Sequence, residues 1–167
     1  MKDVVIRPAV EADVPSINTI YNEYIVGSHV SFDTESWGDE DRLEWFRDRV
    51  SRGYPVLVAC DGDRVIGTSW SGPYRPKKAY RRSVETTVAL ADGMSGRGIG
   101  TAMHTILIDH LKAAGFHRAY AIIALPNDAS IALHSKLGYR EVGTLDESGF
   151  KDGKFHSTMM MELALDR

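Results

Sequence analysis

The sequence is poor in cysteine. Cys60 is the only one among 167 residues, which excludes an internal disulfide, and we therefore expect a reducing compartment, the cytoplasm. It ends the apolar run PVLVAC at residues 55–60. A buried cysteine in a strand is usually a packing residue, and we prefer that interpretation to a catalytic nucleophile.

Long apolar runs and an excess of positive charge are also missing. No run approaches the roughly 18 apolar residues that span a bilayer, and the opening MKDVVIRPAVEAD lacks the apolar core of a signal peptide. Twenty basic residues against 23 acidic ones give a net charge of -3, without the basic surplus typical of nucleic-acid or membrane binding. We expect a soluble cytoplasmic protein with neither kind of partner.

Metal-ligand spacing is the third absence. The remaining histidines outside the segments discussed below, His29, His104, His110 and His117, have no cysteine support and no spacing suited to a metal. The sequence therefore predicts no metal site.

What is present is a regular succession of predicted strands and helices. No repeat or linker interrupts it, so we expect one domain over residues 1–167. Periodicity and turn residues predict strands at 3–9, 84–90, 118–125 (inside the sheet), 139–145 and 155–165, with a hairpin over 54–72 around Asp61-Gly62-Asp63. This pattern, with the helices described next, favours an α/β domain with a central sheet covered by helices.

Four helices complete the predicted order. They begin at Asp13 as N-cap, at about Asp39, at the glycine loop near residue 98 and near Asn127, and the last two end at Gly115 and Gly138. The expected core-facing residues of the first two are Val14, Ile17, Tyr21, Tyr24 and Ile25, then Leu43, Phe46 and Val50.

The segment ADGMSGRGIG (residues 91–100) places three glycines, Gly96, Gly98 and Gly100, before a helix. Each glycine costs about 0.5–1 kcal/mol in backbone entropy, which suggests that the backbone itself has a function there. A strand, a glycine-rich turn and a helix N-terminus together form a common anion site. Two phosphate-binding patterns fail, because Ile99 replaces the lysine of a P-loop and Thr101 the last glycine of a dinucleotide fingerprint.

A third pattern, [RQ]-x-x-G-x-[GA], fits in its second half through Gly98-Ile99-Gly100. Ser95 stands at the first position, where the pattern has arginine or glutamine. Arg97 could supply the positive charge instead. By itself this match is balanced by a simpler reading, a surface turn that leads into a helix.

A second segment strengthens the first. NDASIALHSKLGY (127–139) resembles the N-x-x-[AS]-x-x-L-Y-x-x-x-G-[FY] segment of the Gcn5-related N-acetyltransferases, to which [RQ]-x-x-G-x-[GA] also belongs. Together with SFDTES, SGPYRPKKAY, VETTVAL and GFKDGKFH (149–156), it makes the chain similar to the phosphinothricin / methionine sulfoximine N-acetyltransferase branch from about residue 31 to 156. The resemblance implies a mixed, twisted sheet flanked by helices, with a groove for acetyl-CoA between splayed neighbouring strands. It also implies a homodimer.

The same resemblance implies the cofactor contacts. Asn127 would contact the pantetheine arm, and backbone groups of Val88, Ala89 and Leu90 would bond to it as a strand does. The pyrophosphate would be wrapped by Gly96, Arg97, Gly98, Ile99, Gly100 and Thr101.

The chemistry of acetyl transfer calls for a base and a proton donor, because most amines are protonated at pH 7. Glu85, in an otherwise apolar strand, is the candidate base, since partial burial would raise its pKa. The alternative is a structural ion pair with Arg81, Arg82 or Arg118. His134 stands where the superfamily usually has a tyrosine proton donor. It could protonate the thiolate, or it could pack beside the cofactor without titrating. Water could be the proton donor instead.

The expected substrate is a small amino acid such as phosphinothricin, methionine sulfoximine or methionine sulfone. Arg75, Lys77, Lys78 and Tyr80 precede the strand of Glu85 and would suit a carboxylate, although a solvated basic loop is an equal alternative. Further candidate substrate contacts are Phe32, Thr87 and His156. Two other functions stay open: a peptide N-terminal acetyltransferase and a non-catalytic CoA-binding domain.

Overall fold

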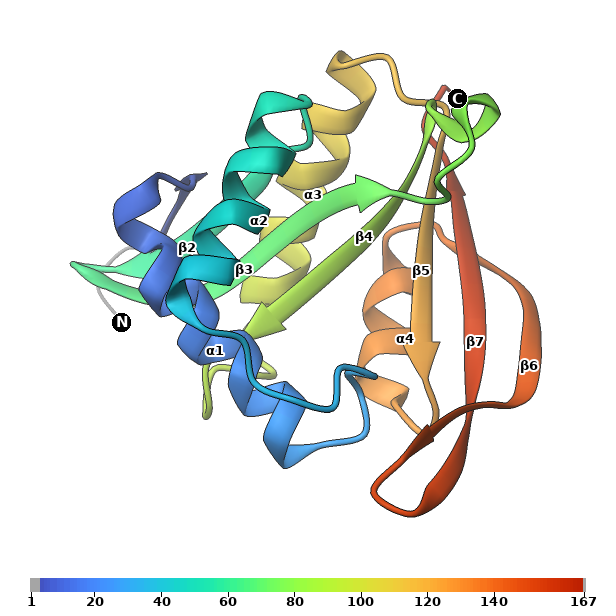
Figure 1. Cartoon of the computed structure of the whole chain (residues 1–167). Helices are drawn as coiled ribbons and strands as arrows, with labels where there is room; N and C mark the ends of the chain where they lie inside the picture. Colours follow the sequence, from blue (N-terminus) through green and yellow to red (C-terminus); the bar gives the residue numbers. More distant parts are fainter. Residues whose placement is uncertain (1–3, 167) are drawn as a thin grey trace.

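The computed structural model describes residues 4–166 and contains one seven-stranded sheet in the order β1-β2-β3-β4-β5-β7-β6 (Figure 1). All neighbouring strands are antiparallel except β4 and β5, which are parallel. The strands are β1 (Val5–Pro8), β2 (Val56–Asp61), β3 (Arg64–Pro73), β4 (Ser83–Leu90), β5 (Arg118–Ala124), β6 (Arg140–Lys151) and β7 (Lys154–Ala164).

Helices cover both faces of this sheet. Helices α1 (Val14–Gly27) and α2 (Asp39–Ser51) lie on one face, and α3 (Ile99–Ala113) and α4 (Asp128–Lys136) lie on the other (Figure 1). Two 3-10 turns, Glu11–Asp13 and Lys78–Tyr80, complete the elements. The order of strands and helices is the predicted one, and the prediction of a mixed sheet flanked by helices is confirmed.

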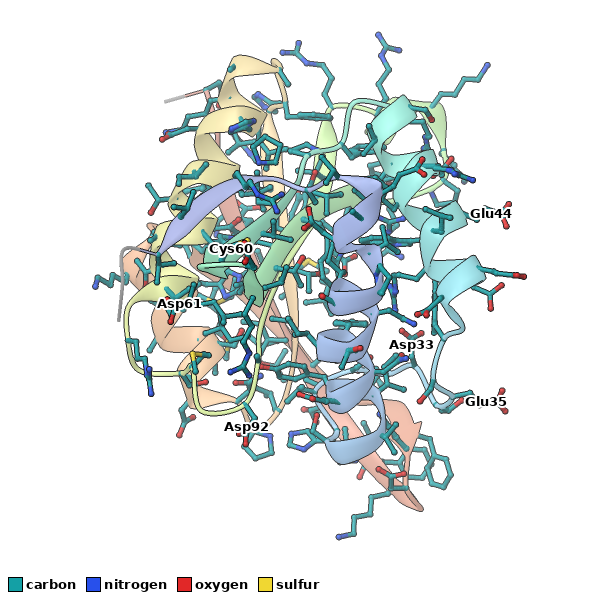
Figure 2. All side chains as sticks on the ribbon, turned by 90° about the vertical axis from the view of Figure 1, so that its left-hand side faces the viewer. Asp33, Glu35, Glu44, Cys60, Asp61 and Asp92 are labelled. Carbon is teal, nitrogen blue, oxygen red and sulfur yellow. The ribbon has the colours of Figure 1, made fainter. Side chains whose placement is uncertain are left out.

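The apolar run of β2 packs against helices on both sides. Val56, Val58 and Cys60 join the cluster under α1 and α2, whereas Leu57 and Ala59 belong to clusters under α3. Because both faces of the strand are buried, it shows no polar alternation. Figure 2 labels Cys60, whose thiol is buried in the first of these clusters, as the packing interpretation expects.

The start of α1 differs from its prediction in one detail. Asp13 precedes α1, but its carboxylate does not cap that helix. It accepts hydrogen bonds from the Val10 N–H at 2.8 Å and from both terminal nitrogens of Arg7 at 2.7 and 2.8 Å. Asp13 is therefore the N-cap residue of α1, as predicted, but its carboxylate closes the preceding 3-10 turn instead of bonding to the first turn of α1.

The buried face of α2 is also partly different. Phe46 is buried as predicted, whereas Val50 is 52% exposed and Arg42 is only 1% exposed. The guanidinium of Arg42 lies 4.2 Å from the ring centre of Trp37, and 5.0 and 5.2 Å from those of Trp45 and Tyr21. Apolar periodicity cannot find such a residue. On the outer side of this layer, Glu35 and Glu44 point into solvent (Figure 2).

The last hairpin is longer than predicted. The sequence predicts a strand only to residue 145, but β6 continues to Lys151 and turns directly into β7. Its pairing with β7 shifts register twice, between Glu141 and Gly143 and between Leu145 and Gly149. These irregularities interrupt the two-residue alternation from which a strand is recognised.

Two negative findings apply to residues 4–166. None of their helices combines the length and the apolar character required to cross a membrane. Nor do these residues contain three histidine, cysteine, aspartate or glutamate side chains arranged to hold a metal ion.

Candidate active site

Strands β4 and β5 separate partway along their length. They pair only at Ser83 with Arg118, Val84 with Ala119 and Glu85 with Tyr120, after which the two strands diverge (Figure 1). The remainder of β4 therefore has one paired edge, toward β3, and one edge that faces a cleft. This is the predicted splay of neighbouring strands.

The peptide groups of β4 differ in what they face. Leu90 donates its N–H to the hydroxyl of Tyr24 at 3.2 Å and accepts from that hydroxyl at 2.9 Å, whereas the Ala91 N–H donates to β3. Because peptide directions alternate along a strand, the backbone N–H and C=O of Val88 point into the cleft, whereas those of Ala89 point toward β3. Of the three predicted pantetheine contacts, the backbone of Val88 is thus best placed, and that of Leu90 already bonds to Tyr24.

The cleft between the strands has a volume of ≈740 Å³, within the usual range for small-molecule sites. It brings together most of the predicted site residues: Phe32, Glu85, Thr87, Val88, Ala89, Leu90, Gly96, Gly98, Gly100, Thr101, Asn127 and His134. Six predicted residues do not line it: Arg75, Lys77, Tyr80, Arg97, Ile99 and His156.

The glycine loop has the geometry of an anion site. Gly96 and Gly98 have φ of +75° and +77°, a backbone region that side-chain-bearing residues rarely adopt. The N-cap of α3 is Gly98, which has no side chain with which to cap the helix. The N–H groups of the first turn, which have no intrahelical acceptor, can therefore meet an anion. Gly96 and Gly98 line the cleft, so these N–H groups lie beside a space that a ligand can enter.

Two other loop residues serve packing. A Cβ at Gly100 would stand 3.0 Å from Cδ1 of Leu133, so glycine here allows α3 and α4 to approach each other. The side chain of Ile99 is 5% exposed and packs in the core with Met103. Only the peptide group of Ile99 is therefore available to a ligand.

Asn127 lines the cleft and also starts α4. Its Oδ1 accepts a hydrogen bond from the Ser130 N–H at 3.1 Å, as an N-cap does. The side-chain amide is thereby held at the mouth of the cleft, next to the end of β5.

Glu85 is the half-buried carboxylate at the point where the strands separate. Burial raises the pKa of its carboxyl group, and the nearby charges of Arg75 and Arg49 oppose that rise. Among residues 4–166, no cation is within ion-pair distance of this carboxylate, whereas Arg82 and Arg118 bond elsewhere. An uncommitted carboxylate with a raised pKa in a cleft is suited to accept a proton.

His134 is 3% exposed on the cleft-facing side of α4. Its Nδ1 lies 2.8 Å from the Ser130 carbonyl oxygen, which places a proton on Nδ1, and its buried Nε2 has no hydrogen-bond partner within the described chain. Burial lowers the pKa of this imidazole, and the bond to Ser130 opposes that effect only in part. At neutral pH His134 is therefore an uncharged acceptor at Nε2.

A buried hydrogen-bonded chain lies beneath the same cleft. Nε2 of His104 lies 3.2 Å from the hydroxyl of Tyr139, which lies 3.0 Å from Oγ1 of Thr86. Thr86 in turn donates to the Tyr120 carbonyl at 3.2 Å, at the end of the β4–β5 ladder. Burial lowers the pKa of His104 to about 3, so the imidazole in this series of hydrogen bonds is uncharged at neutral pH.

The predicted substrate residues form two groups. Arg75, Lys77 and Tyr80 lie on an exposed loop, where the guanidinium of Arg75 is 5.0 Å from the ring centre of Tyr74. Phe32 lies at a wall of the cleft, and His156 packs behind it, with ring centres 6.3 Å apart. Only Arg75 of the first group is close enough to influence Glu85.

Several residues at the site were not predicted from the sequence. Tyr21 and Tyr24 line the cleft although helical spacing assigned them to the core, and Arg49 is close enough to affect Glu85. Ala121 and Ile123 of β5 line the opposite wall. The only sequence signal for the two tyrosines was their polar tip on an otherwise apolar face.

Comparison with known proteins agrees with this geometry. Residues 17–139 match the model of the acetyltransferase (GNAT) family. The chain is 42% identical, over 98% of its length and 97% of the relative, to a phosphinothricin N-acetyltransferase of Streptomyces coelicolor. It is 37% identical, over 96% and 94%, to an L-methionine sulfoximine/L-methionine sulfone acetyltransferase of Pseudomonas aeruginosa. The structure of yncA from Salmonella typhimurium with its cofactor acetyl-CoA superposes with a TM-score of 0.97 at 31% identity, covering 99% and 96% of the two chains.

Proposed function

The chain belongs to the acetyltransferase (GNAT) family, and we propose that it transfers the acetyl group of acetyl-CoA to the amino group of a small amino-acid-like substrate. The substrate class is of the phosphinothricin, methionine sulfoximine or methionine sulfone type, which are the substrates in the names of its relatives. The observation that carries the proposal is Glu85, a half-buried carboxylate at the point where β4 and β5 separate.

Acetyl-CoA fits the groups around the cleft. The exposed edge of β4 at Val88 offers peptide groups to the pantetheine amides, and Gly96, Gly98 and the N-terminus of α3 offer N–H groups to the pyrophosphate. Asn127 lines the same cleft, at the start of α4. The thioester would then lie near the separation point of the strands, within reach of Glu85.

The proposed reaction begins when Glu85 accepts a proton from the substrate ammonium, directly or through water. The neutral nitrogen attacks the thioester carbonyl carbon, the C–N bond forms, and the C–S bond breaks to release the CoA thiolate. The second proton of the nitrogen passes through water to the thiolate. The products are the N-acetyl amino acid, free CoA thiol and protonated Glu85, which returns its proton to solvent.

His134 has two candidate roles: a proton donor to the thiolate, or a residue that packs beside the cofactor without titrating. We propose the second. A general acid must hold a proton at the working pH, and burial lowers the pKa of this imidazole. Its unprotonated Nε2 can instead accept a hydrogen bond from a water or an N–H group in the cleft. Water, rather than His134, is then the proton source for the thiolate.

A small substrate fits the amine end better than a peptide. Phe32 and the loop after α1 line the cleft there, with His156 of β7 packed behind Phe32. Arg75, exposed beside the separation point, is the proposed partner of the substrate carboxylate. A peptide N-terminal acetyltransferase would need an open channel through this wall.

Two further proposals concern the protein's setting. Acetyl-CoA use and an unpaired thiol at Cys60 favour the cytoplasm. A homodimer is favoured by the apolar side chains that β6 and β7 expose, Val142, Leu145, Phe150 and Phe155.

The function is tested by release of CoA thiol from acetyl-CoA, followed with a chromogenic disulfide. The amines are methionine sulfoximine, phosphinothricin, methionine sulfone, ordinary amino acids, polyamines and short peptides. We expect turnover with the sulfoximine, sulfone or phosphinothricin class, reduced at least about a hundredfold in Glu85→Gln. The matched control is Glu44→Gln, which removes an exposed carboxylate on α2.

Other outcomes point elsewhere. Turnover with peptides alone would contradict the small-substrate proposal. Acetyl-CoA binding without turnover of any amine would favour a non-catalytic CoA-binding domain, and full activity in Glu85→Gln would remove the proposed base.

A further inference from the structure

A buried lysine joins the last hairpin to the end of α1. Lys151, the final residue of β6, is 4% exposed. Its Nζ donates to the carbonyl oxygens of Ile25 at 2.6 Å, Ser28 at 2.9 Å and Ser31 at 2.7 Å. These carbonyls belong to the last turn of α1 and to the loop that follows it.

This arrangement satisfies every donor of the ammonium group. A lysine carries three N–H donors, and each meets one carbonyl oxygen. The carbonyl end of a helix carries a partial negative charge, so a cation there is favoured over any neutral side chain. Removal of the ammonium group would therefore leave three carbonyl oxygens without these bonds beside a buried side chain.

The same loop carries a wall of the cleft. Val30, Ser31 and Phe32 line it, and the third carbonyl bound by Lys151 is that of Ser31, next to Phe32. Phe32 rests on Gly149, two residues before Lys151: a Cβ at Gly149 would lie 2.2 Å from the Phe32 ring.

A third contact lies on the other strand of the hairpin. His156 of β7 stacks on His29 with ring centres 5.0 Å apart, and Nε2 of His29 lies 3.0 Å from the Pro126 carbonyl oxygen after β5. In Figure 1 the loop after α1 and the β6–β7 turn lie near each other at the open end of the sheet. The hairpin therefore holds the loop at several points.

We propose that Lys151 is a positioning residue that fixes Phe32 and the loop 28–32 as the wall against which the amine substrate binds. This inference rests on the proposed function, because it assigns that wall to the amine and the glycine loop to acetyl-CoA. Lys151 does not touch the reacting atoms; it acts through the loop. It also gives the GFKDGKFH segment a physical role that the catalytic groups do not supply.

The test compares Lys151→Met with Lys154→Met. Methionine keeps most of the apolar stem and removes the three donors, and Lys154 is the exposed register partner of Lys151 in the same hairpin. We expect KM for the amine to rise about tenfold in Lys151→Met, with kcat and KM for acetyl-CoA changed less than about twofold. The Lys154→Met variant should match the wild type.

A second variant protects the test against simple misfolding. Gly149→Ala leaves Lys151 in place, but its added methyl group would collide with the ring of Phe32 and displace it. This variant should therefore also raise KM for the amine without raising KM for acetyl-CoA. An unchanged KM for the amine in both variants, or an equal rise for both substrates, would overturn the proposal.

Hydrogen exchange separates this proposal from the proposed function. Amides of residues 26–33 should exchange faster in Lys151→Met than in the wild type and in Lys154→Met, whether or not any amine in the panel reacts. If no amine reacts but the loop is released, the proposed function fails and the positioning contact stands. If the loop keeps its protection, the positioning role is wrong.

Discussion

At the scale of single residues, the site depends on groups that are placed in unfavourable states. Glu85 is a carboxylate whose pKa burial raises, and His134 is an imidazole whose pKa burial lowers. Gly98 lies in the left-handed region at φ +77°. Each of these features is unfavourable to folding, and each belongs to a residue that lines the cleft.

The glycine loop allows a prediction with an internal control. Gly98 and Gly115 both have φ of +77°, and neither would bring a Cβ within 4 Å of a neighbour, but only Gly98 lines the cleft. Alanine at either position should lower the free energy of unfolding by about 1–2 kcal/mol, measured by urea denaturation. Only Gly98→Ala should raise KM for acetyl-CoA. An equal effect of the two substitutions on KM would show that the loop does not hold the cofactor.

At the scale of elements, polar side chains hold the ends of helices and the turns beside them. Asp13 closes the turn before α1, Asn127 caps α4, and Lys151 binds the end of α1. The pair of Arg7 and Asp13 is the first of these along the chain and connects β1 to that turn.

Asp13→Asn should destabilise the protein in a pH-dependent manner. Hydrogen bonding to Arg7 lowers the pKa of the Asp13 carboxyl below its usual 3.8. A lowered pKa in the folded state contributes stability that is present above pH 3.8 and is lost as the pH falls through the folded-state pKa. At pH 7 the variant should lose about 1.5–3 kcal/mol, measured by urea denaturation. A difference that does not shrink in acid would contradict the ion pair as its source.

The order of elements was predictable from the sequence because apolar periodicity, glycines and prolines report local geometry. The glycine loop and the Asn127 segment were predictable as motifs, since short spacings carry them. Arg42 and Lys151 were not, because apolar periodicity does not identify a buried cation. Arg42 lies among the rings of Trp37, Trp45 and the more distant Tyr21, and Lys151 binds three carbonyls far away in the chain. The end of β6 was missed because its register shifts hide the alternation.

At the scale of the whole molecule, β6 is an edge strand that exposes apolar side chains. Leu145 is 56% exposed, and Phe150 and Phe155 are exposed near the turn into β7. Edge strands of this kind invite pairing with another chain. A second copy of the chain could cover this surface in a symmetric dimer.

Light scattering at micromolar concentration tests the dimer. We expect twice the 18.5 kDa mass for the wild type and a shift toward the single-chain mass in Leu145→Lys. The control is Leu43→Met on α2, which changes an apolar residue away from this edge. A single-chain mass for the wild type would contradict the proposed dimer.

The central claim is that Glu85 is the base for a small amine. Its most direct test is the pH dependence of kcat/KM for methionine sulfone, measured by thiol release. Because the base must be deprotonated, the rate should fall as the pH decreases through a pKa that lies above the usual 4.5 of a glutamate. In Glu85→Gln this limb should disappear, leaving a weak residual rate that depends only on the substrate amine. The same acid limb in the variant and in the wild type would contradict the account.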